Sequence, residues 1–159
     1  SGPSIEFDFR LDAAKVAIGS KRGKATWVHD GFCMTLACNA NAGELSCGAL
    51  GVGVSAHTSG RVNAGDSLSV SFDRDVIVES AGITSEGGSC GGYYVVGNKA
   101  PLAIYCVDGD NDAQDQRGNL SDIGVLLQGE ELTLNSSRHM DVEAPGDWVL
   151  QTLRVRPLD

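Results

Sequence analysis

The chain has 159 residues, of which 42% are hydrophobic, and its 21 acidic and 12 basic side chains give a net charge of −9. A negative field of this size repels phosphate backbones, and no apolar run approaches the ~20 residues of a membrane helix, so we expect neither nucleic acid as a partner nor a membrane span in this chain. The length suits one domain with one core. We expect that domain at residues 4–159, because Ser1–Pro3 is typical of the remnant left by tag removal.

Alternation of apolar and polar residues begins near the N-terminus and recurs along the chain. Residues 5–11 are the clearest case, with Phe7, Phe9 and Leu11 on one face. Because successive side chains of a strand point to opposite faces, this period of two predicts half-buried strands. Further strands are expected at residues 25–29, 32–38, 50–56, 67–72, 76–83, 93–96, 102–107, 124–127, 131–135 and 148–156. Helical turns are expected only at residues 13–18 and 114–122, since no longer window has helical spacing.

Turn residues separate these segments. Glycine occurs 21 times, and together with Asn, Asp and Ser it interrupts the chain about every ten residues. About ten short strands at this spacing predict an all-β fold, namely an antiparallel two-sheet β-sandwich that is jelly-roll-like. Residues 65–72 and 129–134 both lead from a glycine and a carboxylate into alternating apolar residues. We interpret this recurrence as one structural solution used twice, a turn that leads into a strand.

Glycine alternates with valine at residues 51–54, which leaves one strand face without side chains. We expect another segment to pack closely against this face, or a bulge to form there. The segment does not have the pattern of a nucleotide-binding loop, because neither the third glycine nor a phosphate-binding lysine follows.

The five cysteines, Cys33, Cys38, Cys47, Cys90 and Cys106, match neither zinc-knuckle spacing nor a redox Cys-x-x-Cys. We expect two disulfides, one between Cys90 and Cys106 and one within the other three cysteines, with one cysteine left unpaired. This pattern is typical of a secreted or cell-surface protein, and we expect its export signal and anchor to lie outside this chain. The alternative is that all five are buried free thiols of a cytosolic protein.

An acidic segment follows the expected strand at residues 102–107. Asp108, Asp110 and Asp112 occupy the first three ligand positions of an EF-hand-like loop, and carboxylates at alternate loop positions can converge on Ca²⁺. The rest of that pattern is missing, because Ala113 stands where the turn glycine belongs and Asn119 replaces the closing glutamate. Two interpretations stay open: a looser structural calcium site of the extracellular type, and a solvated turn.

Patterns typical of catalytic sites are weak. Residues 87–91 match G-x-S-x-G, but we expect a strand after them, where a nucleophile elbow needs a helix, so Ser89 is not expected to be a nucleophile. The histidines His29, His57 and His139 lie far apart and form no zinc-binding motif. The sequence therefore predicts a protein that is not an enzyme.

Aromatic side chains suggest another kind of site. Exposed Trp and Tyr rings stack on sugar rings, and Trp27, Tyr93 and Tyr94 are the candidates for such a platform. Adjacent strand residues face opposite ways, so one tyrosine is expected in the core and the other at the surface. Trp148, which opens the last expected strand, is interpreted as a core residue.

Four segments carry a resemblance to a known family: Asp-Gly-Phe-Cys-Met-Thr-Leu at 30–36, Gly-Ala-Leu-Gly-Val-Gly-Val at 48–54, the run at 63–78, which includes Leu-Ser-Val-Ser-Phe-Asp, and the last strand at 148–155. In this order they resemble secreted bacterial β-sandwich domains of exosortase-sorted (PEP-CTERM-type) proteins. The resemblance transfers no functional residues, and the cysteines and the acidic segment have no counterpart in it.

The resemblance implies export, a jelly-roll-like sandwich and a non-catalytic role, structural or adhesive, in the envelope or extracellular matrix. The expected partner is an extracellular polysaccharide or a surface protein, and calcium is the one cofactor that the sequence suggests. The alternative function is that of a carbohydrate-binding module that uses exposed aromatic rings.

Overall fold

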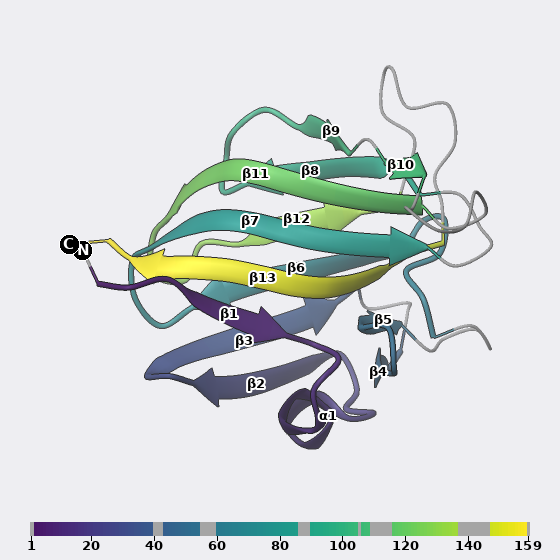
Figure 1. Cartoon of the computed structure of the whole chain (residues 1–159), viewed down its shortest axis with the longest axis horizontal. Coiled ribbons are helices and arrows are strands. Elements are labelled where there is room, and N and C mark those ends of the chain that lie inside the picture. Colours follow the sequence, from purple (N-terminus) through teal and green to yellow (C-terminus); the bar gives the residue numbers. More distant parts are fainter. Residues whose placement is uncertain are drawn as a thin grey trace.

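The computed structural model describes residues 2–39, 43–54, 60–85, 90–104, 106–108, 116–136 and 147–158 of the chain. Within these ranges the chain forms thirteen strands and one short helix, and the strands make two antiparallel sheets (Figure 1). The prediction of an all-β protein with two antiparallel sheets is therefore confirmed. No helix in these ranges has the length and apolar character needed to cross a membrane.

The larger sheet has seven strands. Six of them follow the order β10 (Val107–Asp108), β11 (Gln116–Leu126), β7 (Val76–Ser85), β13 (Val149–Pro157), β5 (Val52–Val54) and β4 (Leu45–Cys47). The seventh, β1 (Ile5–Asp8), pairs with β13, with Ile5 opposite Val155. The first and last strands of the described chain therefore lie side by side (Figure 1).

The smaller sheet has six strands. Their order is β2 (Lys24–His29), β3 (Phe32–Cys38), β6 (Ser67–Phe72), β12 (Leu132–Asn135), β8 (Gly92–Val96) and β9 (Leu102–Ile104). The two segments with the recurrent turn-and-strand pattern become β6 and β12, and these two strands are neighbours, with Ser69 opposite Thr133.

Both sheets direct their apolar side chains into one core. In β6, Leu68, Val70 and Phe72 are buried, whereas the serines between them are partly exposed. Phe7 and Trp148, on the side of the other sheet, are fully buried and belong to the same hydrophobic cluster. The alternation seen in the sequence thus follows from strands that pack one face inward and leave the other to solvent.

The first predicted strand is shorter than expected. β1 ends at Asp8, and a short helix, α1 (Asp12–Ile18), follows it. Phe7 and Phe9 are fully buried as predicted, but the prediction that Leu11 faces inward is wrong, because Leu11 precedes the helix and is 49% exposed. The predicted helical turn at residues 13–18 is confirmed.

The second predicted helical turn, at residues 114–122, is wrong. β11 runs from Gln116 to Leu126 and pairs with β7 at both of its ends. A register shift between Ser121 and Gly124 interrupts this pairing, and Leu120 and Ile123 on either side of it are both buried. A bulge of this kind changes the period of two locally to a spacing of three, which imitates a helix in the sequence.

The close approach predicted at residues 51–54 is confirmed. A Cβ on Gly53 would collide with the carbonyl oxygen of Gly60 and lie 2.7 Å from the Cα of Arg61. A Cβ on Gly51 would collide with the carbonyl oxygen of Leu150 in β13. Glycine at both positions therefore lets β5 and the residue before it lie directly against two other stretches of backbone.

Candidate functional site

Two of the three aromatic residues considered for a sugar-binding platform, Trp27 and Tyr94, are buried. Trp27 is only 4% exposed and packs edge-on against Phe7 and Phe9, with ring centroids 5.2 and 5.7 Å away. The prediction of Trp27 as a surface ring is therefore wrong, because the inward face of β2 carries it into the core. Tyr94 is also buried, which raises the pKa of its hydroxyl. Tyr93 is partly exposed on the opposite face of β8, as expected for its neighbour in a strand.

The predicted calcium ligands lie mostly outside the described residues. Asp110 and Asp112 are not among them, and Asp108 is described only as a residue of β10 whose backbone pairs with Gln116. In the part of the chain that the structure describes, no group of three or more His, Cys, Asp or Glu side chains is arranged to hold a metal ion. Calcium binding by this segment stays a prediction.

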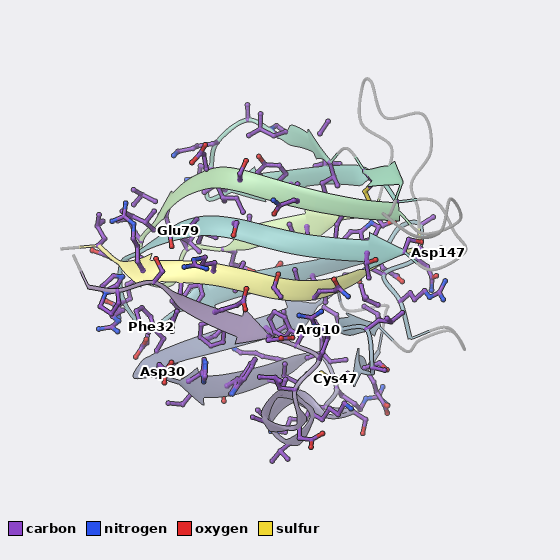
Figure 2. All side chains as sticks on the ribbon, viewed as in Figure 1. Arg10, Asp30, Phe32, Cys47, Glu79 and Asp147 are labelled. Atoms are coloured by element: carbon purple, nitrogen blue, oxygen red, sulfur yellow. A yellow bond between two sulfur atoms is a disulfide. The ribbon has the colours of Figure 1, made fainter. Side chains whose placement is uncertain are left out.

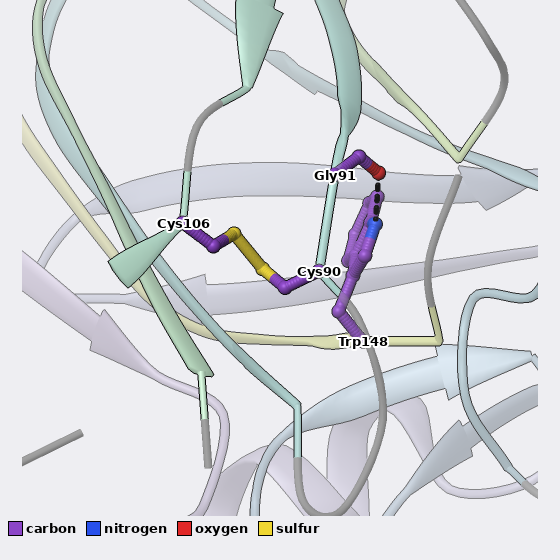
Figure 3. The surroundings of a disulfide bond; sticks show 4 residues. All are labelled: Cys90, Gly91, Cys106 and Trp148. Carbon is purple, nitrogen blue, oxygen red and sulfur yellow. Dashed lines mark hydrogen bonds between the residues drawn. A yellow bond between two sulfur atoms is a disulfide. The ribbon is translucent and has the colours of Figure 1, made fainter. Parts of the chain in front are cut away.

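The predicted disulfide between Cys90 and Cys106 is confirmed, with a Cα–Cα distance of 5.7 Å (Figure 3). Cys90 lies just before β8, and Cys106 lies between β9 and β10. The disulfide therefore lies where the chain passes from the six-stranded sheet, which contains β8 and β9, to the seven-stranded sheet, which contains β10. Beside it, the indole N–H of the fully buried Trp148 donates a 3.0 Å hydrogen bond to the carbonyl oxygen of Gly91. The prediction of Trp148 as a core residue is confirmed as well.

The predicted second disulfide is wrong, because Cys33, Cys38 and Cys47 are all free thiols. Cys33 and Cys38 lie five residues apart on β3, which separates their Cα atoms by about 17 Å, beyond the ~7 Å that a disulfide spans. Cys47 belongs to β4 of the other sheet, where its thiol donates to the carbonyl oxygen of Phe9 at 3.2 Å. Burial raises the pKa values of the Cys38 and Cys47 thiols.

The residues weighed as catalytic candidates do not come together in the described structure. Ser89, His57 and His139 lie outside the described residues. His29 lies at the end of β2, where its ring packs 5.4 Å from Phe7 and 5.3 Å from Trp27, measured between ring centroids. This environment is that of a side chain packed at the edge of the core.

The outer face of the six-stranded sheet carries a set of hydroxyl groups that the sequence analysis did not assign. This hydroxyl face consists of Thr26, Thr35, Ser67, Ser69, Ser71 and Thr133. Cross-strand register places Thr35 opposite both Thr26 and Ser71, and the Ser69 and Thr133 hydroxyls form a 3.2 Å hydrogen bond. The one signal in the sequence was the serine at every second position of residues 67–71.

A hollow of about 240 Å³, which we call the sheet hollow, opens on this face. Its lining includes Lys24, Thr35, Ala37, Ser69, Ser71 and Glu131. Short side chains of the central strands β3 and β6 form its floor, whereas Lys24 comes from the edge strand β2 and Glu131 from the residue that precedes β12. The hollow thus offers hydroxyl groups, one ammonium group and one carboxylate to a ligand.

A second hollow, of about 300 Å³, lies beside β4 and β5. It is lined largely by glycine backbone and by the apolar residues Ala49, Leu50 and Val149, with Ser46 and Arg61 as its polar side chains. Although it is larger, it presents fewer polar side chains than the sheet hollow. We therefore take the sheet hollow as the candidate functional site.

The outer face of the seven-stranded sheet differs, because it carries ion pairs between long side chains. Glu79 of β7, labelled in Figure 2, lies 3.6 Å from the guanidinium of Arg154 and 3.5 Å from that of Arg156. Just after β1, Arg10 donates hydrogen bonds of 2.9 and 3.0 Å to the carboxylate of Asp8, which hold the pKa of that carboxyl below its usual value. These pairs bring side chains of opposite charge together on this sheet.

No protein-family model, curated protein or solved structure matches this chain.

Proposed function

We propose that the chain is an exported, non-catalytic β-sandwich module, jelly-roll-like in its strand arrangement, with a structural or adhesive role at the cell surface or in the extracellular matrix. The observation that carries this proposal is the Cys90–Cys106 disulfide. Disulfides persist in oxidising compartments and are rare in the cytosol. The two antiparallel sheets around one core support the sandwich architecture.

The test combines fractionation with thiol counting on the protein isolated from its host. We expect the protein in the extracellular or envelope fraction, with three of its five cysteines reactive after denaturation, because Cys33, Cys38 and Cys47 are free. The reduced protein serves as the control and should show five reactive cysteines. A protein found in the cytosolic fraction with all five thiols reactive before reduction would overturn the proposal.

Adhesion is tested separately, by retention of the purified protein on isolated envelopes and extracellular matrix of the host. The proposal includes calcium stabilisation through Asp108, Asp110 and Asp112, which predicts a higher melting temperature with Ca²⁺ than with EDTA. An unchanged melting temperature would remove calcium from the proposal and leave the role of the module in place.

A second candidate function, carbohydrate binding, is favoured by the position of Tyr93. Among the three aromatic residues predicted for a platform, Trp27 and Tyr94 are buried and Tyr93 lies on the outer face of the six-stranded sheet. The hydroxyl face and the sheet hollow lie on that same face. Hydroxyl groups and a partly exposed ring on one sheet face are an arrangement that suits a sugar chain.

A further inference from the structure

We propose that the sheet hollow binds one unit of a neutral polysaccharide through vicinal hydroxyl groups of the sugar. This inference rests on the proposed surface role and gives that role a ligand class. It also moves the centre of the site away from the aromatic residues, to the central strands β3 and β6 and their neighbours.

The geometry of the face sets the size of the ligand. Lys24 pairs in register with Ala37, and Ala37 pairs with Ser69, so the three residues form one row across β2, β3 and β6. Neighbouring strands lie about 4.8 Å apart and alternate residues on one strand about 7 Å apart, so the hydroxyl groups form a regular grid. The hollow of about 240 Å³ is smaller than the ~300–1,000 Å³ of pockets for drug-sized ligands, which suits a single sugar unit.

The chemistry of the lining selects a neutral, polyhydroxylated ligand. Ser and Thr hydroxyls both donate and accept hydrogen bonds, the Lys24 ammonium only donates, and the Glu131 carboxylate only accepts. A sugar hydroxyl can accept from one such group while it donates to another, and hydrogen bonds to the two charged groups are the stronger ones. Ala37 adds a small apolar surface to the floor, against which sugar C–H groups can pack.

Other ligand classes fit the hollow less well. An anionic polymer would meet Glu131 and a chain of net charge −9, with Lys24 as the one basic residue in the lining. A purely apolar ligand would cover the hydroxyl groups of Ser69 and Ser71 without replacing their hydrogen bonds to water, which is costly. A neutral sugar avoids both penalties.

The position of Tyr93 extends the site along the sheet. Tyr93 lies opposite Asn135 of β12, and Asn135 lies opposite Ser67 of β6. Tyr93 is therefore two strands away from β6, a distance of about 10 Å across the sheet. A second or third sugar unit of the same chain would reach its ring, so the site favours an oligosaccharide that crosses the strands over a monosaccharide.

The test begins with a glycan array that contains neutral polysaccharides (xylan, mannan, β-glucans), acidic ones (alginate, polygalacturonate) and amino-sugar polymers. Binding to oligosaccharides of the strongest neutral hit is then measured by calorimetry. We expect Glu131→Gln, which keeps the size of the side chain, and the double variant Ser69→Ala/Ser71→Ala each to weaken binding by about tenfold or more. Ser121→Ala, which removes an exposed hydroxyl of β11 in the other sheet, is the matched control and should bind like the parent protein.

Melting temperatures of all variants separate loss of binding from loss of folding. Ser69 bonds to Thr133, so the double variant is expected to melt slightly lower, whereas Glu131→Gln should melt like the parent. Unchanged affinity in Glu131→Gln and in a folded double variant, or a preference for acidic glycans, would overturn the inference. Retention on host envelopes or matrix without any neutral-glycan binding would also overturn it and would leave the proposed surface role standing, whereas the absence of both would count against both.

Discussion

Removal of the Cys90–Cys106 disulfide is expected to lower the free energy of unfolding by about 3 kcal/mol. The bond closes a loop with a sequence separation of 16 residues. Closing a loop of this length removes about 10 cal/mol/K of chain entropy from the unfolded state, which corresponds to about 3 kcal/mol at 298 K. Both cysteines also pack against the hydrophobic core, so replacing them by alanine removes a small amount of buried surface in addition.

The assay is equilibrium unfolding in urea, followed by the fluorescence of the two tryptophans, Trp27 and Trp148, which are both buried. The parent protein is compared with Cys90→Ala/Cys106→Ala, each with and without a reducing agent. We expect the reducing agent to destabilise the parent protein and to leave the double variant unchanged. Cys33→Ser, which alters a free thiol, should keep the response of the parent to reduction.

Two results would refute this reasoning. One is a double variant whose free energy of unfolding lies within about 0.5 kcal/mol of the parent value, the range expected for ordinary surface substitutions. The other is a parent protein that shows five reactive thiols before any reduction, where the structure predicts three.

Three further predictions follow from the packing and the charges. Gly53→Ala should lower the free energy of unfolding by about 1–3 kcal/mol, because its Cβ would overlap packed backbone. Gly48→Ala is the control and should change it little, because its Cβ would meet nothing within 4 Å. Urea unfolding compares the two variants, and equal stabilities would contradict the predicted close contact. Burial raises the pKa of the Cys47 thiol, so its alkylation by iodoacetamide, followed by mass spectrometry, should be slow at pH 7 and should still accelerate above the ordinary thiol pKa of 9.0. A rate that levels off at or below pH 9.0 would contradict the raised pKa. Arg10 lowers the pKa of Asp8, so the stabilisation from this pair is present above the ordinary carboxyl pKa of 3.8 and is lost as the pH falls through the lower folded value. Arg10→Ala should therefore cost less than about 1 kcal/mol at pH 7 and nothing in strong acid, and an equal cost at both pH values would point to lost packing instead.

Strand positions were predictable because the alternation of apolar and polar residues in a strand can be recognised from a short stretch of sequence. β6 and β12 lie where the alternation placed them, and their apolar residues are buried as the pattern requires. Two predictions about secondary structure and burial failed where the backbone departs from this period. The bulge between Ser121 and Gly124 spaces two buried residues three apart, and the helix α1 ends the alternation that Leu11 otherwise continues.

The error over Trp27 could have been avoided from the sequence. Trp27 shares its strand face with Ala25, whereas Lys24, Thr26 and Val28 share the other, and the burial of β2 follows this division. The error over the second disulfide has a similar origin, because Cys33 and Cys38 fall within one continuous strand, which holds them too far apart to bond. In both cases the spacing of the residues along the strand predicts the observed structure, whereas the residue type alone does not.

The sheet hollow, in contrast, was not predictable, because it depends on which strands are neighbours. Lys24, Ser69 and Glu131 lie up to 107 positions apart in the chain, and only the order β2, β3, β6, β12 brings them to one face. Alternation predicts which side of a strand faces solvent but not which strand lies beside it. In the sequence, a set of small hydroxyl side chains of this kind therefore cannot be distinguished from the ordinary solvent-facing residues of a strand.

Strand order also places the two recurrent segments, residues 65–72 and 129–134, side by side in one sheet. The two copies are not merely similar, since they become the adjacent strands β6 and β12, with Ser69 hydrogen-bonded to Thr133 directly opposite it. Each copy buries its apolar residues and turns its polar residues outward, so the pairing of the copies adds Thr133 to the three serines of β6 and places Glu131 at the border of the sheet hollow. The first copy thus supplies Ser69 and Ser71 to the floor of the proposed sugar site, and the second supplies Glu131 to its border. Substitutions of these three residues should consequently affect ligand binding, whereas substitutions of the inward leucines should affect stability first.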